Sequence, residues 1–189
     1  MKTNMMTKIA MGLVGALFSV SAFAQDVGIV VGARADNADG NNNVKITGKT
    51  GFQAGVIAKF DMTGALQLRT GFLATQRSYE YSIATPAVLN DEFRMTYFEI
   101  PAGVLWKFSD YGGVFAGPAV SLGLSKSCPG GDCAGAEVNG SPLSFQFGGS
   151  FKVAPQVGFE VYYETMLSDV AKDVKSGRSL MANLMITFD

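Results

Sequence analysis

The sequence contains no histidine, and this absence removes several kinds of chemistry at once. Without an imidazole there is no Ser-His-Asp triad, no Cys-His nucleophile pair and no histidine-ligated metal. Two acids, Glu160 and Glu164, share one face of an expected strand, but four residues of strand rise separate them by about 13 Å. Paired glycosidase carboxylates stand only about 5–9.5 Å apart. The sequence therefore predicts no enzyme, no cofactor and no metal site.

Charged residues are also scarce. They make up 16% of the chain, and 15 basic against 16 acidic residues leave a formal net charge of −1. Nucleic-acid-binding domains carry a concentrated basic patch, which this sequence lacks. We expect no nucleic-acid partner.

Long apolar runs are missing after residue 24. Before that point, Lys2 and Lys8 precede an apolar stretch from Ile9 to Val20, and Ala22-Phe23-Ala24 matches a cleavage site. The apolar stretch is shorter than the roughly 20 residues of a membrane-spanning helix. We predict a cleavable signal peptide over residues 1–24 and one exported domain over 25–189. If that domain crosses a membrane, it must do so with strands.

The sequence does contain strong two-residue alternation, most clearly from Met95 to Phe108. The even positions 98 to 108 are all apolar and end in Trp106 and Phe108, whereas the odd positions carry Glu99 and Lys107. Successive strand residues point to opposite faces. A soluble sheet would bury the apolar face, whereas a membrane barrel would turn it toward lipid.

Eight segments share this pattern: Asp26–Ala35, Phe52–Asp61, Ala65–Tyr81, Met95–Phe108, Val114–Leu124, Leu143–Val153, Val157–Glu164 and Ser179–Phe188. Seven of them reach the roughly 9–11 residues of a tilted transmembrane strand, and Val157–Glu164 reaches it with the residues that flank it. Pro118 cannot donate to a ladder, so we expect a local gap in pairing there.

The connections between these segments alternate between long and short. The short ones are Met62–Gly64, Ser109–Gly113 and Ala154–Gln156, and the long ones are Asp36–Thr50, Ser82–Asp91, Lys126–Ser141 and Leu167–Arg178. Outer-membrane barrels have short periplasmic turns, long external loops and an even strand number. The sequence thus predicts an all-β, eight-stranded antiparallel up-and-down transmembrane β-barrel.

Aromatic residues gather near the short connections. Outward aromatics at one height are typical of an interfacial girdle. The predicted girdle consists of Phe60, Trp106, Phe108, Phe151 and Phe188.

The inward face carries charges of both signs: Arg34, Lys59, Arg69, Glu99, Lys107, Lys152, Glu160 and Glu164. Side chains just fill the interior of an eight-stranded barrel, and buried charges need partners. We favour a plug of ion pairs over the alternative, a gated path for ions. For Glu99 we expect Arg69 or Arg34 as the partner.

The two cysteines, Cys128 and Cys133, are separated by Pro-Gly-Gly-Asp in one long connection. An exported chain meets oxidising conditions, and this spacer favours a turn. We predict a Cys128–Cys133 disulfide, which contributes about 2 kcal/mol because its loop is short. It would shape the loop rather than the barrel.

The segment Tyr97-Phe98-Glu99-Ile100-Pro101 resembles the fourth-strand signature of the porin-family outer-membrane β-barrel domain. The whole mature chain resembles the small barrels of the OmpA/OmpX type. This resemblance implies residence in the outer membrane of a Gram-negative-type bacterium, contact with outer-membrane lipid and insertion by the barrel-assembly machinery. Such barrels usually end on an aromatic residue, whereas here Asp189 follows Phe188.

The expected function is that of a non-enzymatic, lipid-anchored scaffold. It would present four loops to an extracellular ligand, and its narrow charged lumen would pass small solutes or ions slowly. The alternative is a secreted, soluble, lipocalin-like barrel that binds a small apolar ligand. That alternative requires an apolar interior and a polar exterior, which reverses the faces assigned above.

Overall fold

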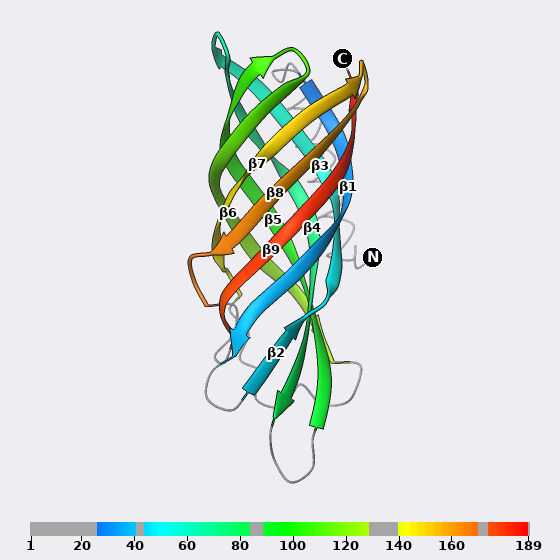
Figure 1. Ribbon diagram of the computed structural model, residues 1–189, viewed down its shortest axis with the longest axis vertical. Helices are drawn as coiled ribbons and strands as arrows, with labels where there is room; N and C mark the ends of the chain where they lie inside the picture. The colour runs from blue at the N-terminus through cyan, green and yellow to red at the C-terminus, as the bar shows by residue number, and fades with distance from the viewer. Residues whose placement is uncertain (1–25, 41–43, 84–88, 129–139, 170–173, 189) are drawn as a thin grey trace, which may run out of the picture.

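The chain forms a closed β-barrel in the computed structural model, which describes residues 26–40, 44–83, 89–128, 140–169 and 174–188 (Figure 1). The predicted signal peptide lies outside these residues. No helix in the described ranges is long and apolar enough to cross a membrane. Their strands are β1 (Asp26–Gly40), β2 (Val44–Gly48), β3 (Thr50–Thr63), β4 (Leu66–Ile83), β5 (Leu89–Ser109), β6 (Gly112–Ser127), β7 (Leu143–Ala154), β8 (Val157–Met166) and β9 (Val174–Phe188).

Eight of these strands form the wall, and β2 is an addition to it. Neighbours in the ring β1, β3, β4, β5, β6, β7, β8, β9 pair antiparallel, and β9 closes on β1. Among the described strands, β2 has its ladder with the far end of β4, from Tyr79 to Ile83. The prediction of an eight-stranded up-and-down barrel is confirmed. A closed ring leaves no sheet edge to be satisfied, which a lipid environment requires.

A one-residue bulge separates β2 from β3. Gly48 faces Tyr79 in the β2–β4 ladder, and Phe52 faces Gln76 in the β3–β4 ladder. Four residue steps along the β2–β3 segment therefore pass only three steps along β4, so the β2–β3 segment contains one extra residue. That residue is Lys49, whose amide donates to the Ser78 carbonyl at 3.0 Å. Because side chains alternate, the bulge changes which positions of the strand point inward.

The connections sit at two ends of the barrel (Figure 1). Three of them, residues 64–65, 110–111 and 155–156, have two residues each and lie at one end. Gly64 adopts a φ of 52°, which suits glycine in such a tight turn. We call this the short-turn end and the opposite end the loop end.

The strands at the loop end run further than the sequence analysis expected. β1 continues to Gly40 and β9 starts at Val174, so the connections are shorter than the expected loops Asp36–Thr50 and Leu167–Arg178. The reason is that Asp and Asn favour turns but do not prevent backbone pairing, and β1 keeps its ladder with β9 beyond Ala35. Residues 44–49, 78–83 and 89–94 form a three-stranded sheet beyond the ring, the distal extension (Figure 1).

The ladder between β5 and β6 is interrupted where the sequence places Pro118. Pairing holds at Pro101 with Ala119 and resumes at Val104 with Ala116. A proline nitrogen has no hydrogen to donate, so this break is the expected local gap.

The outward face is apolar and the inward face is polar. Exposed large apolar side chains form a belt around the wall: Ile29, Val31, Phe52, Leu68, Val104, Trp106, Val120, Leu122, Phe147, Val161, Leu184 and Ile186. Buried arginines and glutamates lie inside. These are the faces of a lipid-embedded barrel and the reverse of those that the lipocalin-like alternative requires.

Candidate functional site in the barrel lumen

The lumen contains two layers of ion pairs. The distal ionic layer, nearer the loop end, consists of Arg34, Asp36, Arg77, Glu99 and Glu164. Glu164 bridges two cations, with Arg34 Nη2 at 2.9 Å from Oε2 and Arg77 Nη2 at 3.0 Å from Oε1. Arg77 Nη2 also lies 3.0 Å from Glu99 Oε2, and Arg34 Nε lies 2.7 Å from Asp36 Oδ1. All of these side chains are fully buried.

Neutral donors complete the hydrogen bonding of the three carboxylates in this layer. Ser144 Oγ donates to Glu164 at 2.7 Å, Gln146 Nε2 donates to Glu99 at 2.7 Å, and Ser179 Oγ donates to Asp36 at 2.6 Å. A buried ion pair offsets its desolvation cost only when such additional bonds are made. The strands that supply these donors, β7 and β9, lie across from Arg77 on β4.

The proximal ionic layer lies nearer the short-turn end and consists of Arg69, Glu160 and Lys59. Arg69 donates two bonds to Glu160, from Nε at 3.1 Å and from Nη2 at 2.5 Å. The guanidinium carbon also stands 4.2 Å from the centroid of the Phe115 ring. Bidentate geometry and a cation–π contact both hold an arginine more firmly than a single bond does.

A layer of apolar and aromatic residues separates the two ionic layers. Tyr162 lies between Glu160 and Glu164 along β8, and its ring packs 5.5 Å from that of Phe115. Both rings are buried. A Cβ at position 148 would collide with Tyr162, so Gly148 makes room for this ring. The aromatic layer interrupts the polar interior.

A second apolar cluster covers the distal ionic layer on the loop side. It contains the buried residues Ala38, Tyr79, Met95, Tyr97 and Met166, with Ile46 and Cys128 packed against it. We call it the cap. The Arg77 guanidinium carbon lies 4.9 Å from the centroid of the Tyr97 ring. The cap keeps water away from the charges below it.

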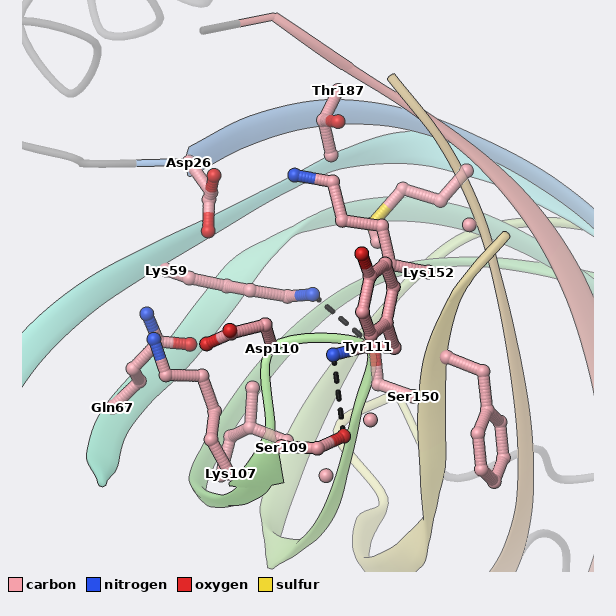
Figure 2. A pocket seen from close by; sticks show the side chains of 16 residues that line it. Asp26, Lys59, Gln67, Lys107, Ser109, Asp110, Tyr111, Ser150, Lys152 and Thr187 are labelled. Atoms are coloured by element: carbon pink, nitrogen blue, oxygen red, sulfur yellow. Dashed lines mark hydrogen bonds between the residues drawn. The ribbon is translucent and has the colours of Figure 1, made fainter. Parts of the chain in front are cut away.

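The short-turn end is more open. A cavity of about 160 Å³, the vestibule, lies there between the strands and the β5–β6 turn (Figure 2). Lys59, Lys107 and Lys152 line it, together with Asp26 and Asp110. Lys59 Nζ donates to Ser150 Oγ at 3.2 Å and lies 4.0 Å from Glu160 Oε1. No group of three or more metal-binding side chains occurs in the described part of the chain.

The structure distributes the eight expected lumen residues over these regions. Arg34, Glu99 and Glu164 lie in the distal layer, Lys59, Arg69 and Glu160 in the proximal layer, and Lys107 and Lys152 in the vestibule.

The expected partner of Glu99 was wrong. The cation beside it is Arg77 rather than Arg69 or Arg34. The stagger between tilted strands sets which residues share a height, and alternation does not report it.

Sequence reasoning also missed two members of the distal layer. Arg77 has the same parity as Arg69 on a segment that was correctly read as one strand, so the alternation alone would have included it. Asp36 has the same parity as Arg34 but begins a run of turn-forming residues, at which the first strand was expected to end.

The remaining candidate residues lie on the outer face and in one loop. Trp106, Phe108, Phe151 and Phe188 are exposed, Phe60 is partly buried, and the Trp106 and Phe108 rings are 6.5 Å apart. They occur near the short-turn ends of their strands. Cys133 lies outside the described residues, so the Cys128–Cys133 disulfide stays a prediction.

Comparison with known proteins shows the fold without a sequence family. No protein-family model and no curated protein sequence matches the chain. Among solved structures, Neisserial surface protein A has a TM-score of 0.58 and 19% identity, over 86% of this chain and 97% of that one.

Two further solved structures are similar. Ail, the attachment invasion locus protein of Yersinia pestis, has a TM-score of 0.51 and 14% identity over 86% of this chain and 98% of its own. The outer membrane protein OprG of Pseudomonas aeruginosa has a TM-score of 0.52 and 10% identity over 87% and 94%. Together with the closed ring and the outward apolar belt, these likenesses show that the chain is a small eight-stranded β-barrel of the outer-membrane type.

Proposed function

We propose that this protein is a non-enzymatic scaffold in the outer membrane of a Gram-negative-type bacterium, where its barrel anchors the long connections at the cell surface. The observation that carries the proposal is the filled lumen. Two ionic layers, an aromatic layer and the cap occupy the interior, while the apolar belt faces outward. A barrel built in this way holds its position in lipid and does not conduct.

Two measurements on the purified, refolded chain test this proposal. Unboiled protein should migrate differently from boiled protein on a denaturing gel, because a lipid-type barrel stays folded in detergent. In planar bilayers the wild-type chain should show no steady ion conductance. Stable open channels of the wild-type protein would contradict the plug.

Topology is tested separately by labelling intact cells. In a Cys128→Ser, Cys133→Ser background, a new cysteine at Lys126 or Ser141 should react with an impermeant thiol reagent. A cysteine at Gly64 or Gly112 should be protected. The opposite labelling pattern would place the short turns outside.

Slow passage of ions or small solutes is the second candidate function. The vestibule favours it, because this cavity opens the lumen part of the way from the short-turn end. Glu99→Gln should leave Arg77 with less compensation in the distal layer and thereby raise bilayer conductance. A variant with wild-type stability and wild-type conductance would remove Glu99 from both the plug and the gate.

In this proposal the loops bind an extracellular ligand, and the end of the last strand contacts the barrel-assembly machinery. One solved structure of Ail holds the heparin analogue sucrose octasulfate, which makes a sulfated sugar a suitable first probe for a ligand of the loops here. Phe188 is the last residue of β9, and we assign it to recognition by the barrel-assembly machinery. Phe188→Ala should reduce the amount of inserted protein in cells more than Leu180→Ala does.

A further inference from the structure

We propose that the vestibule is a binding site for a small oxyanion with more than one negative charge, for which inorganic phosphate is the simplest example. This inference goes beyond the scaffold role and does not depend on it. The site faces the short-turn end, away from the loops.

Three lysine side chains line the vestibule, each from a different strand. Lys59 comes from β3, Lys107 from β5 and Lys152 from β7 (Figure 2). Lys59 is 8% exposed and lies deepest, whereas the other two are partly exposed. Positive charge held in a partly enclosed cavity attracts anions more strongly than charge on an open surface, because less water screens it.

Two of these three lysines are not required to balance the buried charges of the lumen. The buried ionic residues within the described chain are four cations and four anions: Arg34, Lys59, Arg69, Arg77, Asp36, Glu99, Glu160 and Glu164. They balance one another. Lys107 and Lys152 stand outside this balance, and neither forms an ion pair with any residue that the structure describes.

Two carboxylates also line the vestibule, but in the described chain they do not pair with the lysines. Asp110 is exposed on the β5–β6 turn, and Asp26 is partly exposed at the start of β1. Within the described residues, neither lies close enough to a lysine for an ion pair. Lys107 and Lys152 are matched in number by these two carboxylates, so the positive excess at this end comes from the proximal ionic layer, where Lys59 and Arg69 share the single carboxylate of Glu160.

The remaining lining fits a polar ligand. Ser150 Oγ already holds the Lys59 ammonium from the side of β7 and so fixes its direction. The cavity volume of about 160 Å³ suits a tetrahedral oxyanion with a few waters and is too small for a nucleotide or a peptide. Phosphate carries up to two negative charges and four acceptor oxygens, so it gains more from nearby ammonium groups than singly charged chloride does.

The test uses the full mature chain refolded in neutral detergent and titrated with sodium phosphate in a calorimeter at low ionic strength. Saturable binding is expected, and Lys107→Gln combined with Lys152→Gln should weaken it at least tenfold. Lys126→Gln at the loop end is the matched control and should bind like wild type. Asp26→Asn with Asp110→Asn should strengthen binding severalfold, because it removes the rim repulsion.

Several results would overturn the site. They are no saturable binding by the wild-type chain, equal binding by the double lysine variant, or equal competition by sodium chloride at the same ionic strength. Heat-dependent migration on gels verifies that each variant is folded. If the double variant does not refold, Lys152→Gln alone should bind more weakly and Lys152→Arg should restore binding. Loss of binding without any conductance change separates this site from the proposed plug.

Discussion

The molecule contains two groups of ion pairs that have nearly the same bond lengths and very different surroundings. In the distal ionic layer, Arg77 Nη2 lies 3.0 Å from Glu99, and both side chains are 0% exposed. On the distal extension, Lys49 Nζ lies 2.8 Å from Glu80, with the two side chains 41% and 30% exposed. Distance alone therefore does not rank these contacts.

What differs between the groups is the cost of leaving a charge alone. Removing one member of a buried pair strands the other charge away from water and typically costs about 3–5 kcal/mol. On the extension, water solvates whichever charge remains, and salt screens the attraction. The comparison teaches that the lumen pairs matter because of burial and network closure. The surface pairs contribute little.

The largest effect should come from Glu164→Gln. Glu164 accepts from Arg34, Arg77 and Ser144, so its loss leaves two buried arginines with too little negative charge. We expect the barrel to lose about 3–5 kcal/mol of unfolding free energy, the cost of breaking a buried pair. Urea unfolding in lipid vesicles measures it. An unchanged midpoint would mean that water, and not Glu164, compensates the charges of both arginines.

Glu99→Gln should destabilise the barrel less than Glu164→Gln does. Glu99 contacts one arginine, Arg77, and that arginine keeps its second carboxylate in Glu164. The same urea series compares the two variants directly. A larger loss for Glu99→Gln would mean that the distal layer is centred on Glu99 and not on Glu164.

Met95→Ala tests whether the cap is what makes the distal layer different from the extension. Met95 is 1% exposed in the cap, and truncating such a buried side chain should cost about 2–3 kcal/mol, near the low end for methionine. The cavity should also admit water toward Arg77. Faster hydrogen exchange at the backbone of Arg77 and Glu99 would show this, and protection equal to wild type would count against the cap.

The smallest effect should come from Glu92→Gln on the extension. Arg94 donates to Glu92 at 2.8 Å and holds the pKa of this carboxylate below its usual range. A depressed folded pKa contributes stability above the unfolded pKa, and this contribution disappears as pH falls through the folded value. Glu92→Gln should remove only that weak acid-side dependence. A midpoint shift at pH 7 as large as that of Glu99→Gln would contradict the conclusion that exposed pairs contribute less stability than buried ones.

Two-residue alternation was sufficient to predict the strands of the wall and their faces. Apolar positions such as Val104 and Trp106 lie outside, and Glu99 and Lys107 lie inside, because side chains alternate in any strand. Alternation also places Arg77 on the inward face of its strand, as it does Arg69. Connection lengths were sufficient to predict the up-and-down order, since short links join neighbouring antiparallel strands.

Strand ends were less predictable than strand centres. Asp36 reads as the first residue of a turn, yet it lies in β1, and its carboxylate accepts from Arg34, Ser179 and the Ser78 amide. Nothing local indicates the β9 ladder that keeps this segment extended. The bulge at Lys49 is equally hidden, because it is visible only in the register against β4.

The sequence by itself determined the class of this protein: no long apolar run follows residue 24, and the period-two faces fit the strands of a lipid-facing barrel. The tertiary structure decided which charges meet. Barrel closure and strand stagger place residues of β1, β4, β5 and β8 at one height, so Glu99 contacts Arg77 and Glu160 contacts Arg69. The same closure leaves Lys107 and Lys152 without an ion pair in the described chain, because the carboxylates of the same cavity, Asp26 and Asp110, do not come within ion-pair distance of them.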